Sequence, residues 1–266
     1  MTKAQKLIKY FAISLAIFLI VSIISTMIGL VSNIFGFSLS NETKDYKVTE
    51  ITNKIDELDI DINSSKLVFK YDVIFKIEAN TNVKIKEKNN KLTIEEKNTL
   101  FNDTDEEIIV YLPNNYIFNE VSIEAGSSEI NINELYTNKL ELDLGAGAIY
   151  INNLNVYKNA SIESGAGKLE IENSIINNLD LDMGVGKVIL NTILNGSNEI
   201  NAGMGDLEIN LQNSINNYKF KISKGIGEIF INNEKYNDGY INVSGNNLLA
   251  IDGGIGNIKI NTKNWL

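Results

Sequence analysis

The second half of this chain repeats one short sequence element about every 20 residues. Each copy has a run of alternating apolar residues, a Gly-x-Gly pair, a second alternating run and, in most copies, a closing asparagine. The copies occupy residues 121–133 (a degenerate copy), 140–152, 161–172, 179–191, 199–210, 220–232 and 249–261. A fixed period of this length with strand-like alternation is typical of a β-solenoid, in which each repeat forms one coil that stacks on the next. We therefore predict an all-β, single-stranded β-helix.

Aligning the copies on their glycines gives each position a structural role. Apolar residues fall into three columns, which become a continuous core only when coils stack about 4.8 Å apart. The glycines are expected at corners, because glycine adopts positive φ freely and its missing Cβ lets coils approach closely. The closing position predicts a ladder of amide hydrogen bonds along the stack, which Glu172 interrupts. The ladder contains Asn133, Asn152, Asn191, Asn210, Asn232 and Asn261.

The N-terminal segment predicts a membrane anchor. Residues 11–31 are almost continuously apolar, and about 20 such residues span a bilayer as a helix. Lysines precede the segment and no excess of positive charge follows it, which places the N-terminus in the cytoplasm and the rest outside. A cleavable signal peptide ending near residues 38–40 is the alternative, although its apolar core is normally shorter. The lysines concerned are Lys3, Lys6 and Lys9.

Three zones follow: an anchor (residues 1–40), a β-rich part (41–120) and the repeats (121–266). Residues 58–69 resemble a repeat and predict a first coil, so residues 71–119 are expected to be an antiparallel insertion. Asn89 and Asn90 predict a tight hairpin turn within it. Because solenoids need terminal caps, we expect the insertion to cover the first coil and Trp265 and Leu266 to cover the last.

Composition excludes several kinds of chemistry. The chain has no Cys and no His, and all 24 basic residues are Lys, so thiolate, imidazole and guanidinium sites cannot form. The net charge of −10 argues against nucleic acid, whose binding depends on phosphate neutralisation. Every Gly-x-Gly pair is followed by a strand where a phosphate-binding loop would need a helix. We expect no cofactor and no catalytic residues.

Two features remain as candidate binding sites. The first is a column two residues before each glycine pair, in which stacked carboxylates would repel one another. It is either a solvated face relieved by Lys168 and Lys187, or a weak site for divalent cations or a cationic partner. A faint echo of a calcium-binding repeat at residues 252–257 is a single copy with the wrong period. The column contains Asp61, Glu124, Asp143, Glu163, Asp182, Asn201, Ser223 and Asp252, with Asp143, Glu163 and Asp182 as its main candidates.

The second feature is residues 233–248, where the period fails. This segment carries Tyr236 and Tyr240. Solenoid insertions often form binding faces, but a hairpin that protects a sheet edge is the more common outcome. Both interpretations stay open at the level of sequence.

The stretch EEIIVYLPNNYIFNEVSIEAGSSEINI at residues 106–132, followed by the glycine-containing strand repeats, resembles a bacterial adhesin-like β-strand-repeat family of unknown function. That family includes the G component of the Lia cell-envelope stress cluster. The resemblance covers roughly residues 50–262 and implies a right-handed β-helix outside the membrane, with a role in adhesion or the envelope stress response. It carries over no ligand and no catalytic motif.

We therefore expect a single-pass membrane protein whose extracytoplasmic β-solenoid binds or scaffolds an envelope protein or a cell-wall component. The alternatives are a polysaccharide-processing enzyme on the same scaffold, or a self-assembling element whose open end coils match. The sequence leaves the oligomeric state and the identity of the partner open.

Overall fold

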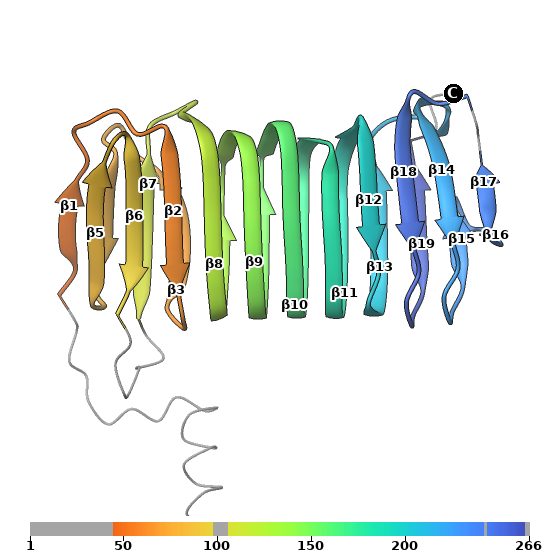
Figure 1. Cartoon of the computed structure of the whole chain (residues 1–266), viewed down its shortest axis with the longest axis horizontal. Coiled ribbons are helices and arrows are strands. Elements are labelled where there is room, and N and C mark those ends of the chain that lie inside the picture. The colour runs from red at the N-terminus through yellow and green to blue at the C-terminus, as the bar shows by residue number, and fades with distance from the viewer. Residues whose placement is uncertain (1–44, 98–105, 242–243, 264–266) are drawn as a thin grey trace, which may run out of the picture. The chain divides into compact units, whose positions relative to one another are not determined.

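The computed structural model describes residues 45–97, 106–241 and 244–263. This part of the chain contains nineteen strands and one short 3-10 helix (Figure 1). The first seven strands are β1 (Lys47–Glu50), β2 (Glu57–Ile62), β3 (Lys66–Tyr71), β4 (Lys76–Ala79), β5 (Val83–Lys88), β6 (Lys91–Glu96) and β7 (Glu107–Leu112). The long repeat strands follow as β8 (Ile117–Ile132), β9 (Leu135–Asn152), β10 (Leu154–Asn177) and β11 (Leu179–Asn195). The remaining elements are β12 (Ser197–Asn201), β13 (Met204–Leu211), η1 (Ile215–Asn217), β14 (Tyr218–Ser223), β15 (Ile229–Ile231), β16 (Glu234–Tyr236), β17 (Gly239–Ile241), β18 (Asn247–Asp252) and β19 (Ile258–Thr262).

Parallel coils stack in register, as the repeats predict. The first side of the stack runs through β2, β8, β9, β10, β11, β12, β18 and β14, and the second through β3, β8, β9, β10, β11, β13, β19 and β15. Equivalent apolar positions such as Ile123, Leu142 and Ile162 are register partners and are buried. The predicted all-β stack with a continuous apolar core is therefore confirmed, whereas its right-handed sense stays a prediction.

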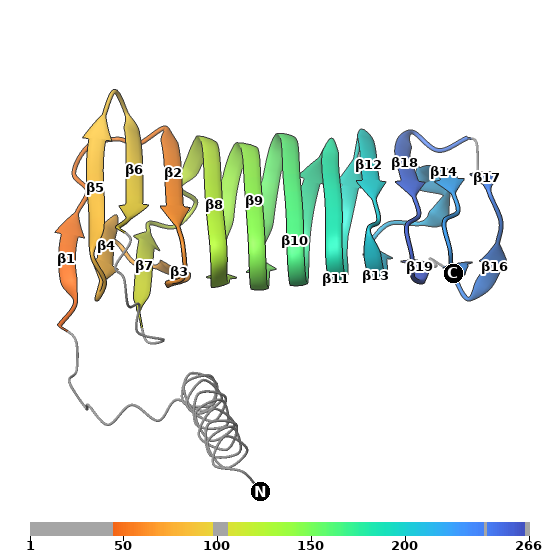
Figure 2. The same ribbon diagram turned by 60° about the horizontal axis from the view of Figure 1, so that its bottom comes forward.

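The order of the coils in space differs from their order in the sequence. β18 lies between β12 and β14, and β19 pairs with both β13 and β15. Figures 1 and 2 show β18 and β19 inserted in this way before the chain's earlier β14 and β15. The last repeat in the sequence is therefore an internal coil, and Trp265 and Leu266, expected to cap the end, lie outside the described residues.

Antiparallel strands close the C-terminal end of the stack. β16 pairs antiparallel with β15, and β17 pairs antiparallel with β14. β16 thus forms with β15 the edge-protecting hairpin that was one of the two interpretations of residues 233–248, and β17 covers the neighbouring edge at β14. Asn232 and Asn233, both at positive φ (50° and 66°), make the turn into β16.

The N-terminal end corrects one expectation. β4 and β5 pair antiparallel with β7 and β6, as expected of residues 71–119. However, β6 and β7 run parallel to β2 and β3 and so form a further coil. Alternation cannot distinguish these cases, because both strand directions have a side-chain period of two. The turn at Asn89 and Asn90 is confirmed, since both have positive φ (52° and 61°) between the paired residues Lys88 and Lys91.

No helix among residues 45–97, 106–241 and 244–263 is long and apolar enough to cross a membrane. The predicted span at residues 11–31 lies outside this part of the chain.

Candidate functional site: an acidic face and an asparagine groove

The predicted acidic column exists and is longer than expected. Glu163 lies between Asp143 and Asp182 in register, and all three are exposed. A second outward column, two residues earlier in each coil, adds further carboxylates. We call these two columns the acidic face; its acidic members are Glu95, Asp61, Glu124, Asp143, Glu163, Asp182 and Asp252 in the first column and Asp59, Glu141, Asp180 and Glu199 in the second.

Neither of the two lysines expected to relieve repulsion on this face does so. Lys168 bonds to Glu170 and lies 4.9 Å from the centre of the Tyr150 ring, on the second side of the stack. Lys187 is its register partner there. Relief comes instead from other neighbours: Asn201 donates to Asp182 at 2.7 Å, and Lys91 lies 2.7 Å from Asp59.

The acidic face does not form a metal site in the part of the chain described. No group of three acidic side chains in residues 45–97, 106–241 and 244–263 is arranged to hold a metal ion. The carboxylates stand side by side, one per coil, and do not converge on a common point. The hypothesis of weak divalent-cation binding gains no support from this geometry.

The two candidate tyrosines lie on different sides of the stack. Tyr236 pairs with the inward Ile229 and packs partly against the core, with its hydroxyl 3.1 Å from Glu234. Tyr240 pairs with Lys221 at the end of the second acidic column and is 59% exposed. Tyr236 is therefore part of the end cap, and only Tyr240 adjoins the acidic face.

A second surface was not predicted as a site. Three hollows of about 240, 250 and 470 Å³ follow the corner at the end of the second side. The first two share Asn133 and Asn152, and the last two share Glu172, so the hollows join into one surface that we call the asparagine groove. It is lined chiefly by asparagine side chains along the stack and by Tyr71, Tyr116, Tyr136 and Tyr150 at one end.

Hydrogen bonds between side chains line the far end of this groove. Asn261 donates to Asn210 at 2.6 Å, Asn210 to Asn191 at 2.6 Å, and Asn191 to Glu172 at 3.2 Å. Glu172 was expected to interrupt the ladder, but a carboxylate accepts hydrogen bonds and so terminates it instead. Asn232, also expected in the ladder, bonds to Thr262 because its positive φ serves the turn into β16.

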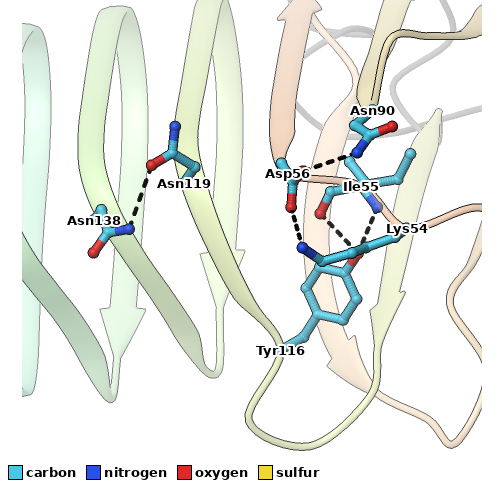
Figure 3. Close-up of polar contacts among 7 residues, drawn as sticks. All are labelled: Lys54, Ile55, Asp56, Asn90, Tyr116, Asn119 and Asn138. Carbon is cyan, nitrogen blue, oxygen red and sulfur yellow. Dashed lines mark hydrogen bonds and ion pairs between the residues drawn. The ribbon is translucent and has the colours of Figure 1, made fainter.

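The tyrosine end of the groove is held by the N-terminal part of the fold. The Tyr116 hydroxyl lies 2.8 Å from both the backbone N and the O of Ile55, as Figure 3 shows. Its ring packs edge-on against Phe75, with ring centres 5.3 Å apart. Burial raises the pKa of the Tyr116 hydroxyl. Tyr116 is thus a fixed wall of the groove.

Asn133 lies where the first two hollows meet. Tyr71 is 58% exposed beside it, and Tyr136 is half-buried. Burial, followed by the charge and hydrogen bonding of Glu134, raises the pKa of the Tyr136 hydroxyl. Within the described residues the Asn133 side chain makes no hydrogen bond, so its amide is available to a ligand. The recurrent asparagines and the tyrosines near strand ends were the signals in the sequence that could have indicated this groove.

A comparison with protein families matches residues 38–260 to the family described as Toastrack DUF4097. No curated protein matches the chain. A crystal structure of a "putative cell adhesion protein" from Clostridium sporogenes is similar at 17% identity and a TM-score of 0.37, covering 82% of this chain and 99% of that chain. A "putative adhesin" from Bacteroides fragilis is similar at 15% identity and a TM-score of 0.48, covering 82% and 98%.

Neither similarity to a solved structure is close enough to support a conclusion. The family match is different in kind, because it extends over most of the chain and includes the strand repeats. It confirms the resemblance inferred from residues 106–132 and the repeats that follow. The chain belongs to the Toastrack DUF4097 family.

Proposed function

We propose that the protein is a membrane-anchored, non-enzymatic binding module of the bacterial envelope, with its β-solenoid outside the cytoplasmic membrane. The observation that carries this proposal is the asparagine groove, which crosses successive coils and is lined by amides and tyrosines. Such a surface suits recognition of an extended ligand that contacts several coils at once. A role in adhesion or in sensing envelope stress would use the same recognition.

The acids that line the groove favour binding over catalysis. A glycosidase needs two carboxyl groups facing each other across the substrate, one of which is available as an acid. Here Glu170 bonds to Lys168, Glu172 accepts a hydrogen bond from Asn191, and Glu134 lies beside the Tyr136 hydroxyl. Each acid already has a polar neighbour and no two of them face each other as a pair, which counts against the polysaccharide-processing alternative.

The ends of the stack count against self-assembly through matching coils. A polymer of coils needs an open parallel strand at each end. In the described residues the outermost strands are β1 and β5 at one end and β16 and β17 at the other. β5, β16 and β17 pair antiparallel with the coil beneath, and β1 pairs antiparallel with β4. β5 also carries Lys84, Lys86 and Lys88 along its edge, and charge on an edge strand opposes further pairing.

The anchor and its orientation rest on the sequence of residues 1–44. The apolar residues 11–31 follow three lysines, and the rest of the chain has 21 Lys against 34 acidic residues, a net charge of −13. A domain with this charge is repelled by anionic lipid headgroups. It would therefore project into the envelope, where wall components or other membrane proteins can reach the groove.

Labelling in intact cells tests the anchor and its orientation. Because the chain has no cysteine, a single introduced cysteine reports its own accessibility. A membrane-impermeant maleimide should label Tyr240→Cys, at a 59% exposed position, in intact cells. It should label Thr2→Cys only after the cells are permeabilised.

The cysteine-free parent chain is the control for background labelling. Labelling of Thr2→Cys in intact cells, or protection of Tyr240→Cys until permeabilisation, would reverse the proposed orientation. Release of Tyr240→Cys into the medium with a shortened N-terminus would instead support the cleaved signal peptide.

A further inference from the structure

We propose that the asparagine groove binds a linear, uncharged glycan strand, with Tyr71, Asn133 and Tyr136 forming the principal contact. This inference rests on the proposed function as a binding module and names its class of ligand. The groove extends from Lys70 at the end of β3 to Lys263 after β19, so a ligand lying in it runs along the stack and across the strands.

The ladder amides retain hydrogen-bonding capacity for such a ligand. A side-chain amide has two N–H donors and two acceptor lone pairs. Asn210 uses one donor to Asn191 and one acceptor for Asn261, which leaves one of each unused in the ladder. Asn191 is placed in the same way between Asn210 and Glu172. The groove therefore offers alternating donors and acceptors, the pattern that sugar hydroxyl groups satisfy.

The tyrosines add the apolar contact that sugar rings require. Aromatic rings give a large, rigid surface with a polar hydroxyl at one edge, and a pyranose presents a face of C–H groups that stacks on such rings. Tyr71 is 58% exposed and Tyr136 lines the same hollow. Tyr150 lines the adjoining hollow, where Lys168 lies over its ring. The principal contact is therefore in the hollow that Asn133 lines together with Tyr71 and Tyr136.

The spacing of the coils favours a glycan over a peptide. Ladder positions recur once per coil, at about 4.8 Å. An extended peptide advances about 3.3 Å per residue, so that only about every third residue returns to a ladder position. A pyranose linked through opposite ring carbons advances by nearly one coil step per sugar, so that successive sugars meet equivalent amides.

Charge favours an uncharged strand. The chain outside the anchor has a large excess of acidic residues, which repels anionic polymers such as wall phosphates or nucleic acid. Within the groove, Lys70 and Lys263 stand with Glu134 and Glu172, and Glu170 is paired with Lys168, so that neither sign dominates. A cationic ligand would be drawn instead to the acidic face on the first side.

Binding of defined tetrasaccharides to the detergent-solubilised full chain tests the inference. The probes are tetramers of β-1,4-linked glucose and of β-1,4-linked N-acetylglucosamine, measured by calorimetry. We expect at least one probe to bind. Asn133→Ala and Tyr71→Ala should each weaken that binding about tenfold, since each removes a contact from the centre of the site.

Tyr240→Ala is the matched control, because Tyr240 is as exposed as Tyr71 (59% against 58%) but lies on the first side. It should bind the probe like the wild type. The thermal midpoints of all three variants should match the wild type, because Asn133 makes no side-chain hydrogen bond among the described residues and both tyrosines are exposed.

The inference is overturned if neither tetrasaccharide binds, if Tyr240→Ala weakens binding as much as Tyr71→Ala, or if an extended peptide displaces the bound sugar at lower concentration than free sugar does. Absence of glycan binding would not change the interpretation of the cysteine-labelling experiment. If the domain faces outward but binds neither probe, the proposed function as a binding module stands and only the glycan as its ligand is rejected.

Discussion

Replacing Gly167 by alanine is expected to lower the free energy of unfolding by about 2–6 kcal/mol, which is the combined range for backbone strain and overpacking. Gly167 has φ of +137°, and an added Cβ would lie 1.9 Å from the carbonyl oxygen of Gly147 in the neighbouring coil. The flexible end of a side chain could move aside, but a backbone carbonyl in a stacked coil cannot. Denaturant unfolding followed by circular dichroism measures the loss.

Substitutions at two other glycines separate the effect of backbone strain from that of close stacking. Gly165→Ala would place its Cβ 2.0 Å from the Gly145 carbonyl oxygen, at a φ outside the left-handed range, so it tests close stacking alone. Gly239 has φ of +139° with nothing within 4 Å of an added Cβ, so Gly239→Ala tests backbone strain alone. Each should cost about 1–3 kcal/mol, less than Gly167→Ala. A Gly167→Ala chain as stable as wild type would contradict the stacked glycine corner.

Replacing Glu96 by alanine is expected to cost about 2–4 kcal/mol, because it removes the buried carboxyl group that accepts several hydrogen bonds from one turn, including that of the buried Ser65. The Glu96 carboxylate is buried and accepts hydrogen bonds from the backbone N–H groups of the β2–β3 turn and from the hydroxyl groups of Ser64 and Ser65. The contacts are Asn63 N at 2.6 Å, Ser64 N at 3.2 Å, Ser65 N at 3.3 Å and Ser65 Oγ at 3.0 Å. Thermal unfolding of the variant measures the change.

Glu95 provides the matched control, since it is the adjacent residue of the same strand and points outward. It pairs with Lys84 at 2.8 Å, on the surface, and exposed ion pairs contribute little to stability. Glu95→Ala should therefore leave the unfolding transition close to that of the wild type. Equal losses for Glu95→Ala and Glu96→Ala would show that the buried carboxylate does not hold the β2–β3 turn.

The local features of the fold could be predicted because each depends on a few consecutive residues. The alternation around each glycine pair fixes which side chains point inward, so the buried columns through Ile123, Leu142 and Ile162 follow from the sequence. Asn89 and Asn90 likewise set their turn by their own tolerance of positive φ. The side-by-side order of Asp143, Glu163 and Asp182 follows from the repeat length.

The order of the coils could not be predicted in this way. Every coil presents similar residues in the same columns, so β18 can pair with β12 as well as β14 can. The choice depends on the segment between β15 and β18, in which β16 and β17 pair with β15 and β14 before the chain returns to β12. Which of several equivalent coils pair with each other is decided by the whole chain, so the sequence of a single repeat does not indicate it.

The asparagine groove was missed for a related reason. Its tyrosine end combines Tyr71 of β3 with Asn133 and Tyr136, more than 60 residues later in the chain. These side chains meet only because β3 stacks against β8, which is a pairing between coils. In the sequence, Tyr71 is the last residue of a strand and Asn133 is one more member of a structural column.

Disulfide trapping tests the coil order most directly, and both the groove and the acidic face depend on that order. Neighbouring coils lie about 4.8 Å apart, and a disulfide needs Cα atoms about 4.4–6.8 Å apart. Asn201 and Asp252 are register partners, whereas Asp252 separates Asn201 from Ser223. In the cysteine-free chain, Asn201→Cys with Asp252→Cys should form a disulfide on mild oxidation, and Asn201→Cys with Ser223→Cys should stay reduced. A disulfide in the second pair and none in the first would mean that the coils stack in sequence order, contrary to this structure.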